Sequence, residues 1–203
     1  MSQPLVSALR FALQMARDKW MQSPLFPFVA GEQLFSRRLA DQAVEAIGCI
    51  PWRRVETDFY TQWENRLDRI DQLPEPFAEI VSAFKNPSVT DLVATLVPDG
   101  ASISVTSLVL HRLMNGDRIE VHNDANDFGE CFRLCWIFGQ RTFSGGHFQT
   151  HHPNPPWTVD ADLAPIQDAW HCFAIGPTSY HSVTPISGDG SGRLSLIVTW
   201  KST

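Results

Sequence analysis

The sequence has few features of a nucleic-acid-binding or membrane-spanning protein. Its 203 residues carry a formal net charge of -6, and the 16 lysines and arginines are scattered rather than clustered. That distribution argues against a partner held through its phosphates. No uninterrupted apolar run approaches the roughly 18 residues that a bilayer-spanning helix needs. We therefore expect no nucleic-acid partner, no membrane partner and a cytoplasmic location.

Cysteines are also few, and their spacing is irregular. The four are Cys49, Cys131, Cys135 and Cys172, with no Cys-x-x-Cys pair among them. Neither a zinc site nor a disulfide framework is indicated, and reduced thiols are the simplest explanation. No segment repeats at a fixed period, which argues against a solenoid.

The first hundred residues read as helices and connectors. Apolar residues recur at helical spacing over 5–20, 39–47, 77–84 and 92–96. Ser36 is a candidate cap for the second helix, and Gly48 is a candidate for its end. Ser88 to Asp91 resembles a capping box at the start of the fourth helix, which should end before 98–100. The charged segment 53–60 is either an edge strand or a loop over a cleft.

From residue 101 the pattern changes to strands. Apolar and polar residues alternate and β-branched residues become frequent. Strands are expected at 103–111, 118–122, 132–138, 147–150, 169–175, 182–185 and 194–200. Helices followed by about eight short strands indicate an α+β fold. We expect one domain over 1–203, with 1–100 mainly helical and 101–203 forming the sheet.

Three residues of this second half form a candidate metal site. His122 and Asp124 are two positions apart, so in an extended strand both side chains lie on the same face. His181 follows at the entrance to a distant strand. Two imidazoles and one carboxylate on one face of a metal leave the opposite face open, which suits an Fe(II) enzyme that activates dioxygen.

A candidate anion anchor follows the metal site. Arg193 and Ser195 are again two apart on a predicted strand, so a guanidinium and a hydroxyl can point into the same pocket. A guanidinium there suits one end of a dicarboxylate.

The ordered set of residues resembles the Fe(II)- and 2-oxoglutarate-dependent oxygenases of the small, prolyl-4-hydroxylase-like kind. The resemblance covers roughly residues 101–203, and Gly116-Asp117 and Phe143 to Gly146 also carry it. It implies a double-stranded β-helix, or jelly roll, with the N-terminal helices packed against it.

The resemblance also implies roles for single residues. His122, Asp124 and His181 would bind Fe(II), and Arg193 with Ser195 would bind the distal carboxylate of 2-oxoglutarate. His111 stands where relatives often carry a tyrosine that contacts this cosubstrate. His147 stands in place of a more usual glutamate, which leaves its contribution open.

The implied reaction uses Fe(II), 2-oxoglutarate and dioxygen to hydroxylate an unactivated C–H bond, with release of succinate and carbon dioxide. The expected substrate is a small molecule or peptide, with an amino-acid or peptide side chain favoured. Asp124 favours hydroxylation over halogenation, because related halogenases replace this carboxylate by a small residue. Desaturation, ring closure and the oligomeric state stay open.

Two other classes of protein remain as alternatives: a non-catalytic jelly-roll binding module and a cupin-type metalloenzyme that uses no keto acid. The Arg193-x-Ser195 pair discriminates, since a cupin needs no carboxylate anchor. His111 fits a core histidine about as well as a cosubstrate contact, and Arg133 either lines the pocket or bridges strands. A second metal site among the remaining histidines is disfavoured, because the adjacent His151 and His152 cannot share a strand face.

Overall fold

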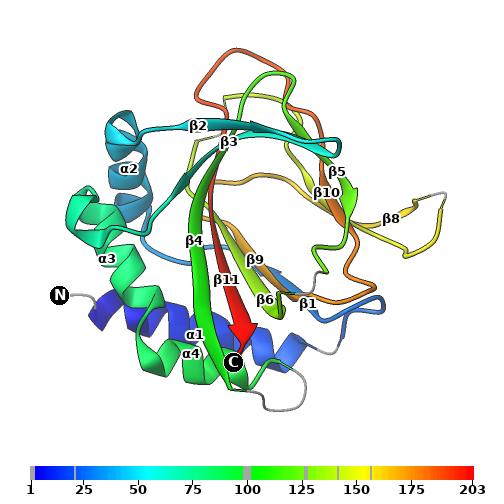
Figure 1. The fold of residues 1–203 in the computed structure, drawn as a ribbon, viewed down its shortest axis with the longest axis horizontal. Helices are drawn as coiled ribbons and strands as arrows, with labels where there is room; N and C mark the ends of the chain where they lie inside the picture. The colour runs from blue at the N-terminus through cyan, green and yellow to red at the C-terminus, as the bar shows by residue number, and fades with distance from the viewer. Residues whose placement is uncertain (1–2, 21, 98–101, 126–127, 141, 156) are drawn as a thin grey trace.

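The structure is a computed structural model that describes all residues except 1–2, 21, 98–101, 126–127, 141 and 156. Its four α-helices precede the long strands in the chain and lie on one side of them (Figure 1). They are α1 Gln3–Lys19, α2 Arg37–Ala46, α3 Glu75–Phe84 and α4 Pro87–Ala94. Among the described residues, no helix is long and apolar enough to cross a bilayer.

The helices occupy the segments that the sequence predicts, and their ends need two corrections. Ser36 caps α2 as expected, since its side chain accepts a hydrogen bond from the backbone N–H of Leu39. Gly48 does not end this helix, because the chain tightens into a 3-10 helix, Ile47–Cys49, that includes it. Asn86, rather than the Ser88 to Asp91 box, caps α4. The expected stop at 98–100 lies outside the described residues.

All of the strands pair antiparallel in one curled sheet. They are β1 Phe28–Gly31, β2 Arg53–Glu56, β3 Tyr60–Arg66, β4 Ile103–Leu113, β5 Arg118–His122, β6 Glu130–Ile137, β7 Phe148–His151, β8 Val159–Leu163, β9 Trp170–Ala174, β10 His181–Val183 and β11 Arg193–Ser202. The order across the sheet is β1-β9-β6-β11-β4-β3-β5-β10-β7-β8, and β2 pairs with β3 at its margin. This is the α+β architecture that the sequence predicts.

The helix layer covers one face of the central strands. On β11, Leu194, Leu196, Val198 and Trp200 are buried in the same apolar cluster as residues of α1 and α3, among them Leu13 and Phe84. The alternate residues of this strand face the interior of the curled sheet. Full burial of each such side chain contributes about 1.5–3 kcal/mol, so the helices and the sheet stabilise each other.

The N-terminal half contains more strands than expected. β1 and β3, which lie before residue 67, and β8 were absent from the prediction, whereas β2 matches the edge-strand alternative for 53–60. β1 pairs with β9, and β3 pairs with both β4 and β5, which follow one another along the edge of β3 opposite β2. The open question about 53–60 is answered, because residues 53–56 form the marginal strand β2 and the chain then turns toward the sheet interior.

Candidate metal site and its cavity

Strand pairing brings the two candidate histidine ligands together. β5 ends at His122, β10 begins at His181, and the two residues are paired across these strands. Their ring centroids lie 4.3 Å apart. Residues 59 positions apart in the chain thus meet at one end of the curled sheet.

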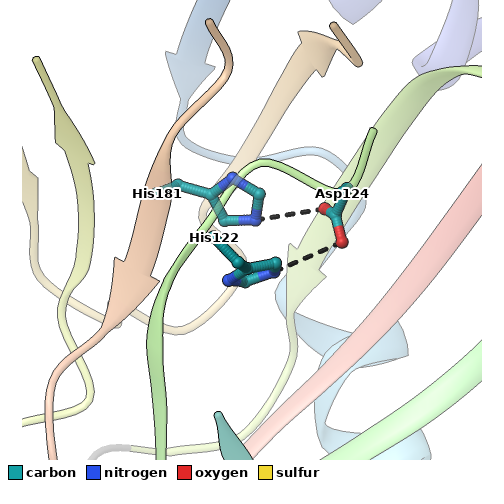
Figure 2. A group of neighbouring side chains, drawn as sticks. All are labelled: His122, Asp124 and His181. Atoms are coloured by element: carbon teal, nitrogen blue, oxygen red, sulfur yellow. Dashed lines mark ion pairs between the residues drawn. The ribbon is translucent and has the colours of Figure 1, made fainter. Parts of the chain in front are cut away.

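Asp124 completes the group from just beyond β5 (Figure 2). One carboxylate oxygen lies 3.2 Å from Nε2 of His122 and the other 3.2 Å from Nε2 of His181. Asp124 does lie beside His122, as predicted, but the predicted cause, an extended strand through both residues, is wrong. Asp124 lies outside the strand with φ +58°, and this left-handed turn brings the carboxylate back toward the rings.

Both imidazole rings are oriented for metal binding. Nδ1 of His122 lies 2.8 Å from the carbonyl oxygen of Glu120, and Nδ1 of His181 lies 2.8 Å from that of Ser179. A carbonyl oxygen only accepts, so each Nδ1 donates its proton and each Nε2 keeps a lone pair. The donor atoms of the triad lie within 4.8 Å of one another, and within the described part of the chain no other such metal-competent group occurs.

The electrostatics of the triad keep its carboxylate ionised. Burial raises the pKa of Asp124, but Arg133 first and then both histidines lower it, so that it lies well below its usual range. Burial also lowers the pKa of His181, although hydrogen bonding to Asp124 opposes this. A deprotonated carboxylate and a neutral imidazole are the forms that bind metals.

Arg193 lies in the same cavity and has no carboxylate partner among the described residues. It is only 3% exposed. One of its terminal nitrogens donates to the hydroxyl of Ser195 at 3.1 Å and the other lies 4.0 Å from the sulfur of Cys135, while Nε is buried without a partner. Residues 193 and 195 contact each other, but of the two only Arg193 lines the cavity, so the expectation that both point into one pocket holds for the arginine alone. A buried guanidinium without a counter-charge is costly, which makes it a receptor for an anion.

His111 lies on β4, lines this cavity and is paired with Ser195 of β11. Burial, followed by the charges of Arg133 and Arg193, lowers its pKa to about 3, so the ring is neutral near pH 7. Its Nε2 lies 3.4 Å from the side-chain nitrogen of Gln62 on β3. Gln62 could not be found from the sequence, because β3 itself carried no recognised signal.

The cavity between triad and anchor measures about 320 Å³, within the range of small-molecule sites. Phe59 and Tyr60, at the turn from β2 into β3, line it near the triad, and the Phe59 ring lies 5.3 Å from that of His122. Ser195 does not line the cavity, although it contacts Arg193. A second cavity of about 280 Å³ shares Phe148, His171 and Arg193 with it.

The remaining histidines lie apart from the triad's metal-facing atoms. His147 pairs with Asp162 on β8, with Nδ1 3.0 Å from a carboxylate oxygen. His151 is buried with Nε2 2.8 Å from the hydroxyl of Ser182, and His171 packs against Phe148. Arg133, which the sequence left unassigned, contacts Asp124 and lines the cavity.

Comparison with known proteins establishes the fold. No protein-family model and no curated protein matches the chain. Solved structures do match it over most of their length. A 2OG-Fe(II) oxygenase family oxidoreductase from Burkholderia pseudomallei has a TM-score of 0.68 at 17% identity, with 93% of this chain and 90% of that chain covered.

The structures of two hydroxylases match this chain about as well. A Pseudomonas putida prolyl-4-hydroxylase has a TM-score of 0.70 at 11% identity, covering 94% of this chain and 98% of that one. A Trichoplax adhaerens prolyl hydroxylase, in complex with a hypoxia inducible factor oxygen degradation domain peptide fragment, has a TM-score of 0.72 at 12% identity, covering 96% and 90%. The chain has the fold of these oxygenases, and the predicted double-stranded β-helix is confirmed.

Proposed function

We propose that the protein is an Fe(II)- and 2-oxoglutarate-dependent oxygenase that hydroxylates an unactivated C–H bond of an amino-acid or peptide side chain. The single observation that carries this proposal is one cavity lined by both a His-Asp-His triad and a buried arginine without a carboxylate partner among the described residues. The shared fold with oxygenases supports it.

The residues present fit the proposed metal. His122, Asp124 and His181 offer two imidazole nitrogens and a carboxylate oxygen from one side, a donor set typical of Fe(II) in oxygenases. The Nδ1 contacts of both rings hold Nε2 toward the shared centre. When bound, Fe(II) with 2-oxoglutarate and dioxygen supplies the oxidising chemistry, and succinate and carbon dioxide are released.

The residues present also fit the proposed cosubstrate. Arg193 would receive the distal carboxylate of 2-oxoglutarate, and Ser195 fixes the guanidinium from one side. His111 is neutral, so it can donate one hydrogen bond without adding charge to a cavity wall that already holds two arginines. The dicarboxylate would thus extend from the anchor toward the triad.

The substrate would enter beside the triad. Phe59 is exposed and lies against His122, while Tyr60 and Ile119 continue the same apolar wall. Such a wall binds side-chain carbon and excludes water from the reacting centre. The preference for an amino-acid or peptide substrate is supported by the prolyl hydroxylases of the same fold, one of which holds a peptide fragment.

Anaerobic titration of the apoprotein with Fe(II) and then with 2-oxoglutarate tests the proposal. We expect the weak visible charge-transfer band of the chelate in the wild type and its loss in Asp124→Ala and Arg193→Ala. Asp162→Ala and Arg118→Ala remove exposed charges outside the triad and anchor and serve as matched controls. Bound metal without a band would point to a cupin-like protein, and no bound metal to a binding module.

A further inference from the structure

Arg133 is a charged residue of the cavity wall that contacts the triad without belonging to it. It lies on β6, paired with Thr199 of β11 and Phe173 of β9. Its neighbours Phe132 and Leu134 are buried in the helix-side apolar cluster, so alternation turns Arg133 and Cys135 toward the cavity. The side chain is 19% exposed, which makes its contacts weakly screened by solvent.

The guanidinium of Arg133 joins two carboxylates. One terminal nitrogen donates to Oδ2 of Asp124. The other donates to Oε2 of Glu130, three residues earlier on the same strand, at 3.2 Å. Glu130 therefore holds the guanidinium through one terminal nitrogen, and Arg133 contacts the carboxylate of Asp124 through the other.

These contacts separate Arg133 from the anion anchor Arg193. The charge of Arg133 is already met by two carboxylates, whereas among the described residues no carboxylate pairs with Arg193. A guanidinium neutralised in this way is poorly suited to receive a further anion. It is well suited to fix the direction of the carboxylate that it contacts.

We propose that Arg133 is a positioning residue that fixes the carboxylate of Asp124 in the orientation in which its two oxygens face Nε2 of His122 and Nε2 of His181. This inference rests on the proposed iron site. Hydrogen bonds from outside the ligand set commonly fix ligands in this way.

Two opposite effects on metal affinity make the inference testable. Removing Arg133 takes a positive charge away from the metal, which alone would tighten Fe(II) binding. It also removes one of the contacts that orient the Asp124 carboxylate, and loss of such supporting contacts typically lowers metal affinity about 10- to 100-fold. The positioning role predicts that the second effect wins.

The experiment measures the dissociation constant of Fe(II) under anaerobic conditions, by competition with a chromophoric chelator, for the wild type, Arg133→Met, Arg133→Lys and Glu130→Gln. We expect Arg133→Met to weaken Fe(II) binding about 10- to 100-fold, and the chelate band with 2-oxoglutarate to shift or broaden. Arg133→Lys should recover part of the affinity, and Glu130→Gln should lose less than Arg133→Met. Arg118→Met, on the exposed part of β5, is the matched control.

The outcomes keep the two proposals apart. A wild type that binds no Fe(II) overturns the proposed function before any variant is measured. A wild type that binds Fe(II), with unchanged or tighter binding in folded Arg133→Met, overturns the positioning role alone. Where Arg133→Met loses its circular-dichroism spectrum, Glu130→Gln decides, and an unchanged dissociation constant in that variant overturns the role.

Discussion

At the scale of single residues, the sequence predicts some contacts of the site and not others. The residue types and order of His122, Asp124 and His181 were enough to predict the triad as a group. The turn that carries Asp124 was not predicted, because spacing alone cannot distinguish an extended residue from one with positive φ. Arg133 stayed ambiguous, since its direction depends on which face of β6 meets the helices.

The anchor can be tested separately from the metal. Arg193→Ala is expected to weaken 2-oxoglutarate binding to the Fe(II)-loaded protein by about 30-fold or more, because a buried charged hydrogen-bond partner is worth about 2–5 kcal/mol. Fe(II) binding without 2-oxoglutarate should change little. Calorimetric titration measures both, with Arg118→Ala as control. Equal 2-oxoglutarate affinity in wild type and Arg193→Ala would favour the cupin-like alternative.

His111 predicts a pH dependence of folding stability for the metal-free protein. Its pKa is about 3 when folded, against about 6.5 when unfolded. Below pH 6.5 His111 is protonated in the unfolded chain but stays neutral in the folded protein. The free energy of unfolding therefore falls as the pH decreases from 6.5 toward 3, by up to about 1.4 kcal/mol per pH unit.

His111→Gln should therefore reduce the stability lost between pH 7.5 and pH 5 by about 1–2 kcal/mol. Urea unfolding of the apoprotein at the two pH values measures the difference, and the exposed His152→Gln is the control. If His111→Gln and the wild type lose equal stability, the histidine is not held neutral by its surroundings.

At the scale of elements, the strands of the second half follow from alternation, whereas the short strands of the first half do not. β4, β6 and β11 each have one face in the helix-side core, so their sequences alternate clearly. β2 is exposed at the margin of the sheet, and its charged residues give no apolar pattern. β1 has four residues, too few for a period to be recognised.

Mutations can test which residue caps the N-terminus of helix α4. Asn86 accepts the backbone N–H of Ser88, so Asn86→Ala should lower the free energy of unfolding by about 1 kcal/mol. Asp91→Ala, which removes the partner that the capping-box interpretation required, should have a much smaller effect. Urea denaturation compares the two. A larger loss for Asp91→Ala would restore the sequence-based assignment.

At the scale of the whole molecule, the N-terminal half and the sheet depend on one another. β3 pairs with both β4 and β5, and β1 pairs with β9. Trp136 and Trp200 are fully buried in the cluster that also contains α1 and α3. Removal of residues 1–100 would expose this apolar face and leave edges of the sheet unpaired.

The expected single domain predicts one cooperative unfolding transition. Far-ultraviolet circular dichroism, which reports the helices, and tryptophan fluorescence, which reports the sheet core, should give the same midpoint in urea. A fragment of residues 101–203 should not fold by itself. Two separated midpoints, or a folded fragment, would show two independent units.

The left-handed turn at Asp124 affects which residue types suit position 124. A non-glycine residue in this conformation costs about 1–2 kcal/mol, less for aspartate, whereas glycine adopts it freely. The backbone conformation alone would favour glycine at this position, whereas the contacts with Arg133 and both histidines favour a carboxylate. Glycine at position 124 would therefore relieve backbone strain but would leave the Arg133 guanidinium with one carboxylate fewer and the triad without its carboxylate ligand.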